Sequence, residues 1–230
     1  MRIAITGTYS SGKTLTSSAL SHYIDLPRAN ARMTRQIMPE ILPGKKLSEC
    51  IPTELIQLVV ARHTERVVHE HDLARGVVSD GCSLQEWSYA ISRVKYGADP
   101  NTSADLKPSQ HVTKTDELAY FETVMEGLGN LFKLHVKKSF DTFIHLNNEL
   151  PLDKDGHRPV NELFRTTSDT RLLMTLKELK LPYHIVSGSV EERLVRIVEI
   201  LDLTPVISAS EAIERAQADY LKLKKPYTGY

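Results

Sequence analysis

The chain has 230 residues, of which 41% are hydrophobic, so it is long enough to bury a full core. Lysine plus arginine and aspartate plus glutamate number 29 each, and this balance excludes a global field that attracts nucleic acid or an anionic membrane. Its two cysteines are too few for a disulfide framework or a zinc cluster. With no bilayer-length apolar run and no signal-peptide pattern, we expect a soluble cytoplasmic protein without nucleic-acid or membrane partners.

Apolar runs typical of buried strands alternate with longer helical patterns along the first half of the chain. This alternation predicts crossover units around a parallel sheet, and hence a three-layer α/β fold. The predicted elements, in chain order, are strand Arg2–Thr6, helix Lys13–Tyr23, a poorly marked strand within Leu26–Met33, a helix over Thr53–Leu73, strand Val77–Asp80 and a helix over Leu84–Tyr96.

The second half opens with an excursion over residues 97–115, which carries two prolines and several turn formers. Two final helices are predicted from the capping boxes that begin at Ser189 and Ser208. No repeat or linker divides the chain, so we expect one domain over residues 1–230. The remaining predicted elements are an amphipathic helix over Leu118–Phe132, strand Thr142–Leu146, a polar segment at about residues 148–166, a helix near Arg171–Leu179 and strand Tyr183–Val186.

The segment GTYSSGKT directly follows the first predicted strand and fits the pattern G-x-x-x-x-G-K-[ST]. Such a loop turns backbone N–H groups toward phosphate oxygens, and the following helix adds the positive end of its dipole. Gly7 allows the tight exit from the strand, and Gly12 allows close approach of an anion. Lys13 is expected to reach the β- and γ-phosphates and Thr14 to offer its hydroxyl to Mg²⁺. The predicted nucleotide-binding residues of this loop are Gly7, Ser10, Ser11, Gly12, Lys13 and Thr14.

Asp80 stands at the carboxyl end of a predicted strand, the edge where open α/β sheets hold ligands. It could hold Mg²⁺ through water or accept the proton of an attacking hydroxyl. The alternative is an aspartate that starts a turn with Gly81. Glu86, on the helix that follows, is a candidate for binding acceptor hydroxyls, with a solvated helical glutamate as the alternative.

The polar segment that contains KDGHRP carries arginines suited to stabilising the charge of a migrating phosphoryl group. Arg158 and Arg165 lie on this segment, and Arg171 is predicted in the first turn of the next helix. We expect one or two of these arginines to face the phosphates. Ordinary solvated surface arginines are the alternative.

The histidines do not form a recognisable metal-binding pattern. His69 and His71 are two positions apart and cannot share a helix face, and no carboxylate-histidine pattern for zinc is present. These two residues and His63 are therefore predicted to be exposed or to act as caps. Core packing is preferred over ligand stacking for four aromatic residues, Trp87, Tyr89, Tyr120 and Phe121.

Taken together, these motifs resemble the P-loop kinases typified by the bacterial ribosylnicotinamide kinase domain, which are related to deoxynucleoside and nucleoside monophosphate kinases. The P-loop, the strand that ends in Asp80, the later Asp-Gly-x-Arg and the final Ser-Gly-x-x-x-Glu-Arg carry the resemblance. It implies a five-stranded parallel sheet in the order 2-3-1-4-5 and a lid at about residues 148–166. It also implies ATP as the donor and Mg²⁺ as the cofactor.

By the same resemblance, Asp80 takes the catalytic acid position and Arg158 the position of the lid arginine. Arg35 looks like the arginine that the family places near the acceptor, and Ser187-Gly188 looks like the turn that contacts the nucleotide base. Two departures fall on the acceptor side. Arg32-Met33-Thr34 stands where the family has an acidic residue, and Asp80-Gly81 stands where it has Asp-Arg.

The resulting hypothesis is a Mg²⁺-dependent enzyme that transfers the γ-phosphoryl group of ATP to a hydroxyl or phosphate of a nucleoside, nucleotide or related small metabolite. Lys13, Asp80 and Arg158 are its predicted catalytic residues. A nucleotide-dependent switch acting through a protein partner is the alternative, and loss of acceptor chemistry with retained binding is a third. The sequence does not specify the acceptor or the oligomeric state, for which a homodimer is one option.

Overall fold

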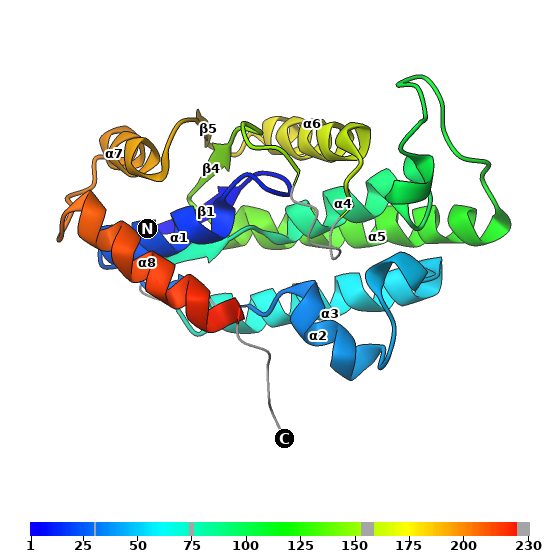
Figure 1. Cartoon of the computed structure of the whole chain (residues 1–230), viewed down its shortest axis with the longest axis horizontal. Coiled ribbons are helices and arrows are strands. Elements are labelled where there is room, and N and C mark those ends of the chain that lie inside the picture. Colours follow the sequence, from blue (N-terminus) through cyan, green and yellow to red (C-terminus); the bar gives the residue numbers. More distant parts are fainter. Residues whose placement is uncertain (30, 74–75, 153–158, 225–230) are drawn as a thin grey trace.

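The computed structural model describes residues 1–29, 31–73, 76–152 and 159–224. Five strands form a sheet in the order β2-β3-β1-β4-β5, which confirms the predicted order (Figure 1). All neighbouring strands are parallel. The strands are β1 (Arg2–Thr6), β2 (Arg28–Ala29), β3 (Val77–Asp80), β4 (Thr142–Leu146) and β5 (Tyr183–Val186).

The central strands are buried along nearly their whole length, as expected for a parallel sheet covered on both faces. Ile5 of β1 pairs with Asp80 of β3 and with Ile144 of β4. The carboxyl ends of these three strands therefore meet at one edge of the sheet, and the loops that leave them share that edge.

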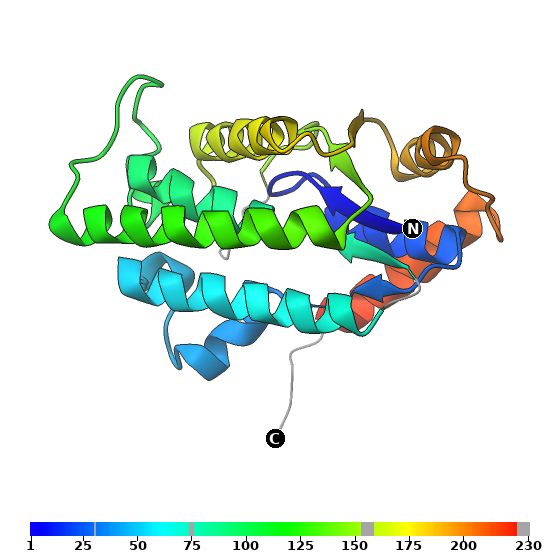
Figure 2. The same cartoon turned by 180° about the vertical axis from the view of Figure 1, so that it is seen from behind.

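Helices cover both faces of the sheet, which confirms the predicted three-layer architecture (Figures 1 and 2). One core contains Ile3, Ile5 and Ile144 of the sheet and packs against α1, α7 and α8. The other contains Ala4, Val77 and Phe143 with apolar residues of the remaining helices. The helices are α1 (Lys13–Tyr23), α2 (Thr34–Ile41), α3 (Pro52–His71), α4 (Ser83–Tyr96), α5 (Asp116–Ser139), α6 (Glu162–Glu178), α7 (Val190–Leu201) and α8 (Ala209–Lys224), with short 3₁₀ turns η1 (Leu47–Glu49) and η2 (Pro100–Ser103).

Three elements differ from the expectations. Strand β2 is only two residues long, and α2 was not predicted. Helix α6 begins at Glu162, where the side chain of Asn161 accepts a 3.0 Å hydrogen bond from the Phe164 N–H. The predicted start near Arg171 is therefore wrong, and Arg171 lies in the middle of α6 instead of in its first turn. Residues 165–171, between Phe164 and Leu172, include no apolar side chain, so hydrophobic periodicity did not extend the predicted helix back to Glu162.

Of the two predicted capping boxes, the one at Ser189 is complete, and among the described hydrogen bonds the one at Ser208 is present as the side-chain cap alone. Ser189 and Glu192 form a reciprocal capping box at the start of α7, with hydrogen bonds of 2.7 and 3.2 Å. The Ser208 hydroxyl accepts a 3.2 Å hydrogen bond from the Glu211 N–H ahead of α8. Over the described residues, none of the helices has the length and apolar character that crossing a bilayer requires.

Candidate functional site

The loop between β1 and α1, residues 7–14, is a tight turn built on two glycines. Gly7 has a φ of 138°, and a Cβ at this position would lie 2.7 Å from Ser11 Oγ and 2.9 Å from the Leu146 carbonyl oxygen. Gly12 precedes α1 in the left-handed region, with φ 86° and ψ 14°. No described side chain caps α1, and its first turn contains no acidic residue. The amides at this helix start are therefore suited to binding an oxyanion.

The structure brings together the two residues predicted to serve a metal ion. Thr14 Oγ1 donates a 2.8 Å hydrogen bond to Asp80 Oδ2, which joins the start of α1 to the end of β3. Arg28 Nη2 lies 3.6 Å from the same carboxylate oxygen. Lys13 Nζ donates a 2.7 Å hydrogen bond to the Thr8 carbonyl oxygen and so folds back over the loop.

This arrangement fits Mg²⁺ bound together with a nucleotide. Mg²⁺ in phosphate-transfer sites takes one or two protein oxygens and completes its shell with phosphate oxygens and water. Thr14 and Asp80 supply two such oxygens beside an anion-binding loop. In the part of the chain that the structure describes, no cluster of three or more His, Cys, Asp or Glu side chains offers a protein-only metal cage.

One cavity of about 700 Å³ connects the phosphate-binding loop to the predicted acceptor side. Of the predicted site residues, Ser10, Gly12, Lys13, Thr14, Arg35, Asp80 and Glu86 line it. The other lining residues are Tyr9, Leu15, Met33, Thr34, Leu47, Arg62, Arg66, Gln85, Tyr89, Leu150, Pro151, Leu152 and Tyr220. Helices α2, α3 and α4 thus add their own side chains to the space in front of the loop.

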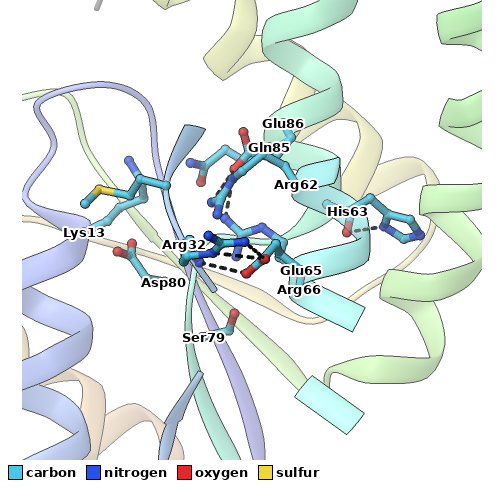
Figure 3. A network of polar contacts seen from close by, with 12 residues as sticks. Lys13, Arg32, Arg62, His63, Glu65, Arg66, Ser79, Asp80, Gln85 and Glu86 are labelled. Atoms are coloured by element: carbon cyan, nitrogen blue, oxygen red, sulfur yellow. Dashed lines mark hydrogen bonds and ion pairs between the residues drawn. The ribbon is translucent and has the colours of Figure 1, made fainter. Parts of the chain in front are cut away.

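Two arginines of α3 form the polar centre of the acceptor side (Figure 3). Arg62 Nη2 and Arg66 Nη2 donate to the same oxygen, Glu86 Oε1, at 3.1 and 2.9 Å. Burial alone would raise the pKa of Glu86, but the charges of the two guanidinium groups lower it to about 2. Glu86 is therefore not a solvated glutamate but the counter-ion of both arginines, and its role in binding acceptor hydroxyls stays a prediction.

Gly81 explains one departure from the Asp-Arg pattern of the resembling kinases. Its φ is 85°, and a Cβ would lie 2.8 Å from Arg66 Nη2. Any side chain at this position would therefore strain the backbone and displace the guanidinium group of Arg66. Glycine directly after Asp80 lets Arg66 lie against the end of β3.

Several predicted nucleotide-binding residues do not line the cavity. Arg165 is buried in the first turn of α6, and its Nη1 donates to the Leu150 carbonyl oxygen at 2.8 Å. Ser187 Oγ accepts from Asn147 Nδ2 at 2.7 Å, and the Gly188 N–H donates to Glu149 Oε2 at 2.9 Å. Gly7 and Ser11 belong to the phosphate-binding loop, but they too are absent from the cavity lining. Residues 153–158 of the predicted lid, which include Arg158, lie outside the described residues.

Sequence reasoning missed Arg62, Arg66 and Gln85 as cavity residues. Two arginines four positions apart share a helix face, so this spacing was the available signal. It also missed the contact between Tyr9 and Tyr89, whose rings stack with centroids 4.1 Å apart and planes 10° from parallel. This stack joins the phosphate-binding loop to α4.

The prediction for His63 is wrong. Its ring lies between α3 and α5, 4.4 Å from the Phe132 ring, and its Nδ1 is 2.8 Å from Ser83 Oγ. Burial lowers the pKa of His63 to about 4. His71, by contrast, is 88% exposed as predicted, and the partly exposed His69 lies 3.8 Å from Glu65.

The aromatic predictions are mostly confirmed. Trp87 and Phe121 are buried, and Trp87 Nε1 donates to the Met125 carbonyl oxygen at 2.8 Å. Tyr89 is buried too, although it also lines the cavity. Tyr120 is exposed, so the prediction of core packing is wrong for this residue.

Solved structures share this fold at low sequence identity. Deoxyadenosine kinase from M. mycoides with bound dATP aligns with a TM-score of 0.59 and 15% identity, over 88% of this chain and 99% of that chain. Thymidylate kinase from Ehrlichia chaffeensis aligns with a TM-score of 0.53 and 13% identity, over 87% of this chain and 98% of that chain. The expected likeness to P-loop nucleoside and nucleotide kinases is therefore confirmed at the level of the fold.

None of the curated proteins matches the sequence. A family model described as an AAA domain matches residues 2–193, which span the P-loop, the complete sheet and the first turn of α7. The chain belongs to this AAA-domain family.

Proposed function

We propose that the protein transfers the γ-phosphoryl group of ATP to a small acceptor of the nucleoside or nucleotide class. One observation carries this proposal: a single cavity is lined both by the phosphate-binding loop and by charged side chains of α2, α3 and α4. A site that only bound or hydrolysed a nucleotide would not need the second half of this cavity. Phosphoryl transfer between two bound molecules needs both halves.

On the donor side, the amides at the start of α1 hold the phosphates, and Lys13 exchanges the Thr8 carbonyl oxygen for phosphate oxygens. Thr14 and Asp80 would hold Mg²⁺, and the bound ion would supply charge neutralisation for the transferred group. The hydrogen bond between these two residues favours the metal role of Asp80 over the role of a turn former. Arg158 as a lid arginine and Ser187-Gly188 as a base-contacting turn stay predictions.

The solved relatives support the acceptor class. Both are kinases by name, one for deoxyadenosine and one for thymidylate, and both align over nearly their whole length. Their sequence identity to this chain is low, so their own acceptors are not transferred to it. We infer the acceptor of this protein from the residues that line its cavity. Cytoplasmic location and a homodimer stay predictions.

One four-residue stretch of the chain matches a guanine-binding motif of GTPases, but its position in the structure does not support the nucleotide-dependent switch. Thr113-Lys114-Thr115-Asp116 matches the N/T-K-x-D pattern by which common GTPases bind guanine. None of these residues lines the cavity, and the Lys114 amine pairs with Glu122 on α5. Thr115 caps α5 by accepting from the Leu118 N–H at 3.2 Å. The tetrad therefore has a local role at the start of this helix.

The test is ADP release by the purified chain with ATP and Mg²⁺ in the presence of a panel of nucleosides and nucleotides. The proposal expects at least one acceptor to stimulate ADP release strongly and to be recovered in phosphorylated form. Lys13→Ala is the matched negative control, because it removes the cation of the loop and leaves the acceptor side unchanged. Stimulation by a protein partner alone, with no phosphorylated small molecule, would contradict the proposal and support the switch.

A further inference from the structure

The guanidinium groups of Arg62 and Arg66 are buried but only partly satisfied. The two residues are 6% and 2% exposed. Arg62 Nε and Nη1 and Arg66 Nε have no hydrogen-bond partner among the described residues. Buried N–H groups on a cation are costly to leave unpaired, so this cluster lacks acceptor oxygens that a ligand can bring.

The charged side chains that line the acceptor side of the cavity also have an excess of positive charge. The cavity wall on the acceptor side carries Arg35, Arg62 and Arg66 against Glu86, whose Oε1 serves both arginines of α3. Asp80 is engaged by Thr14 on the donor side. Burial lowers the pKa of Arg62 in spite of the Glu86 carboxylate, whereas Glu86 and Glu70 together outweigh burial and raise the pKa of Arg66, so the missing counter-charge falls on Arg62.

The cluster lies beside the position of the reaction. Arg66 Nη2 would come within 2.8 Å of a Cβ on Gly81, the residue that follows Asp80. A group bound by Arg62 and Arg66 therefore lies near the carboxylate that we assign to the metal. Planar guanidinium groups are well suited to binding phosphate through several parallel hydrogen bonds. Arg62 Nε and Nη1 and Arg66 Nε together carry four unpaired N–H donors, which suits the three terminal oxygens and the double negative charge of a phosphate monoester.

We propose that the acceptor is a phosphate monoester, such as a nucleoside monophosphate, and that Arg62 and Arg66 hold its phosphate as the attacking group. This inference rests on the proposed function. An oxygen of the acceptor phosphate attacks the γ-phosphorus of ATP, the bond to the ADP oxygen breaks, and a phosphoanhydride and ADP result. Because the second proton of a phosphate monoester dissociates near pH 6, most of the acceptor reacts at pH 7 without a general base.

The experiment compares matched pairs of nucleosides and their 5′-monophosphates with the full chain, ATP and Mg²⁺. We expect kcat/KM for the best monophosphate to exceed that for its nucleoside at least about 100-fold, with a diphosphate as product by ³¹P NMR. Arg62→Gln should raise KM for the monophosphate at least about tenfold and leave KM for ATP within about twofold. Arg32→Gln is the control, because Arg32 binds Glu65 and Glu40 and does not line the cavity.

A binding measurement separates this inference from the proposed function. Each monophosphate and each nucleoside is titrated calorimetrically into the ADP-bound chain and into its Arg62→Gln and Arg62→Lys variants, with folding checked by circular dichroism. Monophosphate binding that Arg62→Gln weakens and Arg62→Lys partly restores supports the subsite, even if no acceptor turns over and the proposed function falls. Equal affinity for nucleoside and monophosphate, or equal loss of both in Arg62→Gln, overturns the inference.

Discussion

Arg193 of α7 donates a 2.8 Å hydrogen bond from its Nη1 to the carbonyl oxygen of Ser11, which lies 182 positions earlier in the phosphate-binding loop. The Arg193 Nη2 lies 3.1 Å from Glu149 Oε2, and the same oxygen accepts the N–H of Gly188 at 2.9 Å. Arg193 is buried, so the contact is shielded from water. The outer side of the loop is therefore held by a charged bridge between the exits of β4 and β5.

The first prediction concerns this bridge. Arg193→Met should weaken binding of a non-hydrolysable ATP analogue about tenfold, because a buried charge-assisted hydrogen bond contributes roughly 1.5–3 kcal/mol and the Ser11 carbonyl would lose its donor. Calorimetry with Mg²⁺ present measures the change. Arg196→Met, on the same helix but largely exposed, is the control and should bind normally. An Arg193→Met protein with unchanged affinity would show that the loop keeps its shape unaided.

Asp80→Asn tests the metal role of this carboxylate. The change keeps the size of the side chain and the hydrogen bond to Thr14 Oγ1 but removes the negative charge. We expect kcat to fall about 100-fold and the Mg²⁺ concentration for half-maximal rate to rise, with ATP binding largely unchanged. Steady-state kinetics over a Mg²⁺ series measures both effects. Normal turnover by this variant would remove Asp80 from the mechanism.

Glu86→Ala should destabilise the fold, because it leaves the two buried arginines of α3 without their counter-ion. Removing one partner of a buried ion pair costs about 3–5 kcal/mol, and we expect the free energy of unfolding in urea to fall by about 3 kcal/mol. Glu199→Ala breaks an exposed ion pair with Arg196 and should cost less than about 1 kcal/mol. Similar losses in the two variants would mean that the Glu86 cluster stabilises no more than a surface pair does.

His63 should make stability depend on pH. Its pKa is about 4 in the folded chain against 6.5 for an ordinary histidine, because burial disfavours the imidazolium. Between these values the unfolded chain binds more protons, so the free energy of unfolding falls as the pH is lowered from about 6.5 toward 4. Urea unfolding at pH 7 and pH 5 should show a smaller loss for His63→Gln than for the parent. His71→Gln, at an exposed position, should retain the full loss.

The elements predicted well are those whose signal is local. The strands β1, β3 and β4 are short apolar runs, and the phosphate-binding loop is a spaced motif that directly follows one of them. Among the described residues, strand β2 is defined by the pairing of Arg28 and Ala29 with Val78 and Ser79 of β3, a tertiary contact that has no sequence pattern of its own. Helix α6 begins with a side-chain cap from Asn161, and the polar run over residues 165–171 interrupts the apolar periodicity that would have connected this start to Leu172.

The acceptor side shows the same division between local and tertiary information. Asp80 was predictable because its strand places it at the ligand edge of the sheet. The role of Glu86 was not, because it depends on two arginines of another helix, α3, that donate to its carboxylate. His63 was misjudged for a related reason: its burial comes from Phe132 on α5, far away in sequence.

The stack of Tyr9 on Tyr89 has a mechanical consequence for the two ends of the cavity. Tyr9 belongs to the loop that we propose binds the donor, whereas Tyr89 lies one helical turn beyond Glu86 on the helix that we propose faces the acceptor. Because the two rings are in direct contact, we expect a shift of one ring on ligand binding to displace the other. We therefore expect the order in which the two substrates are added to influence the rate of approach to steady state.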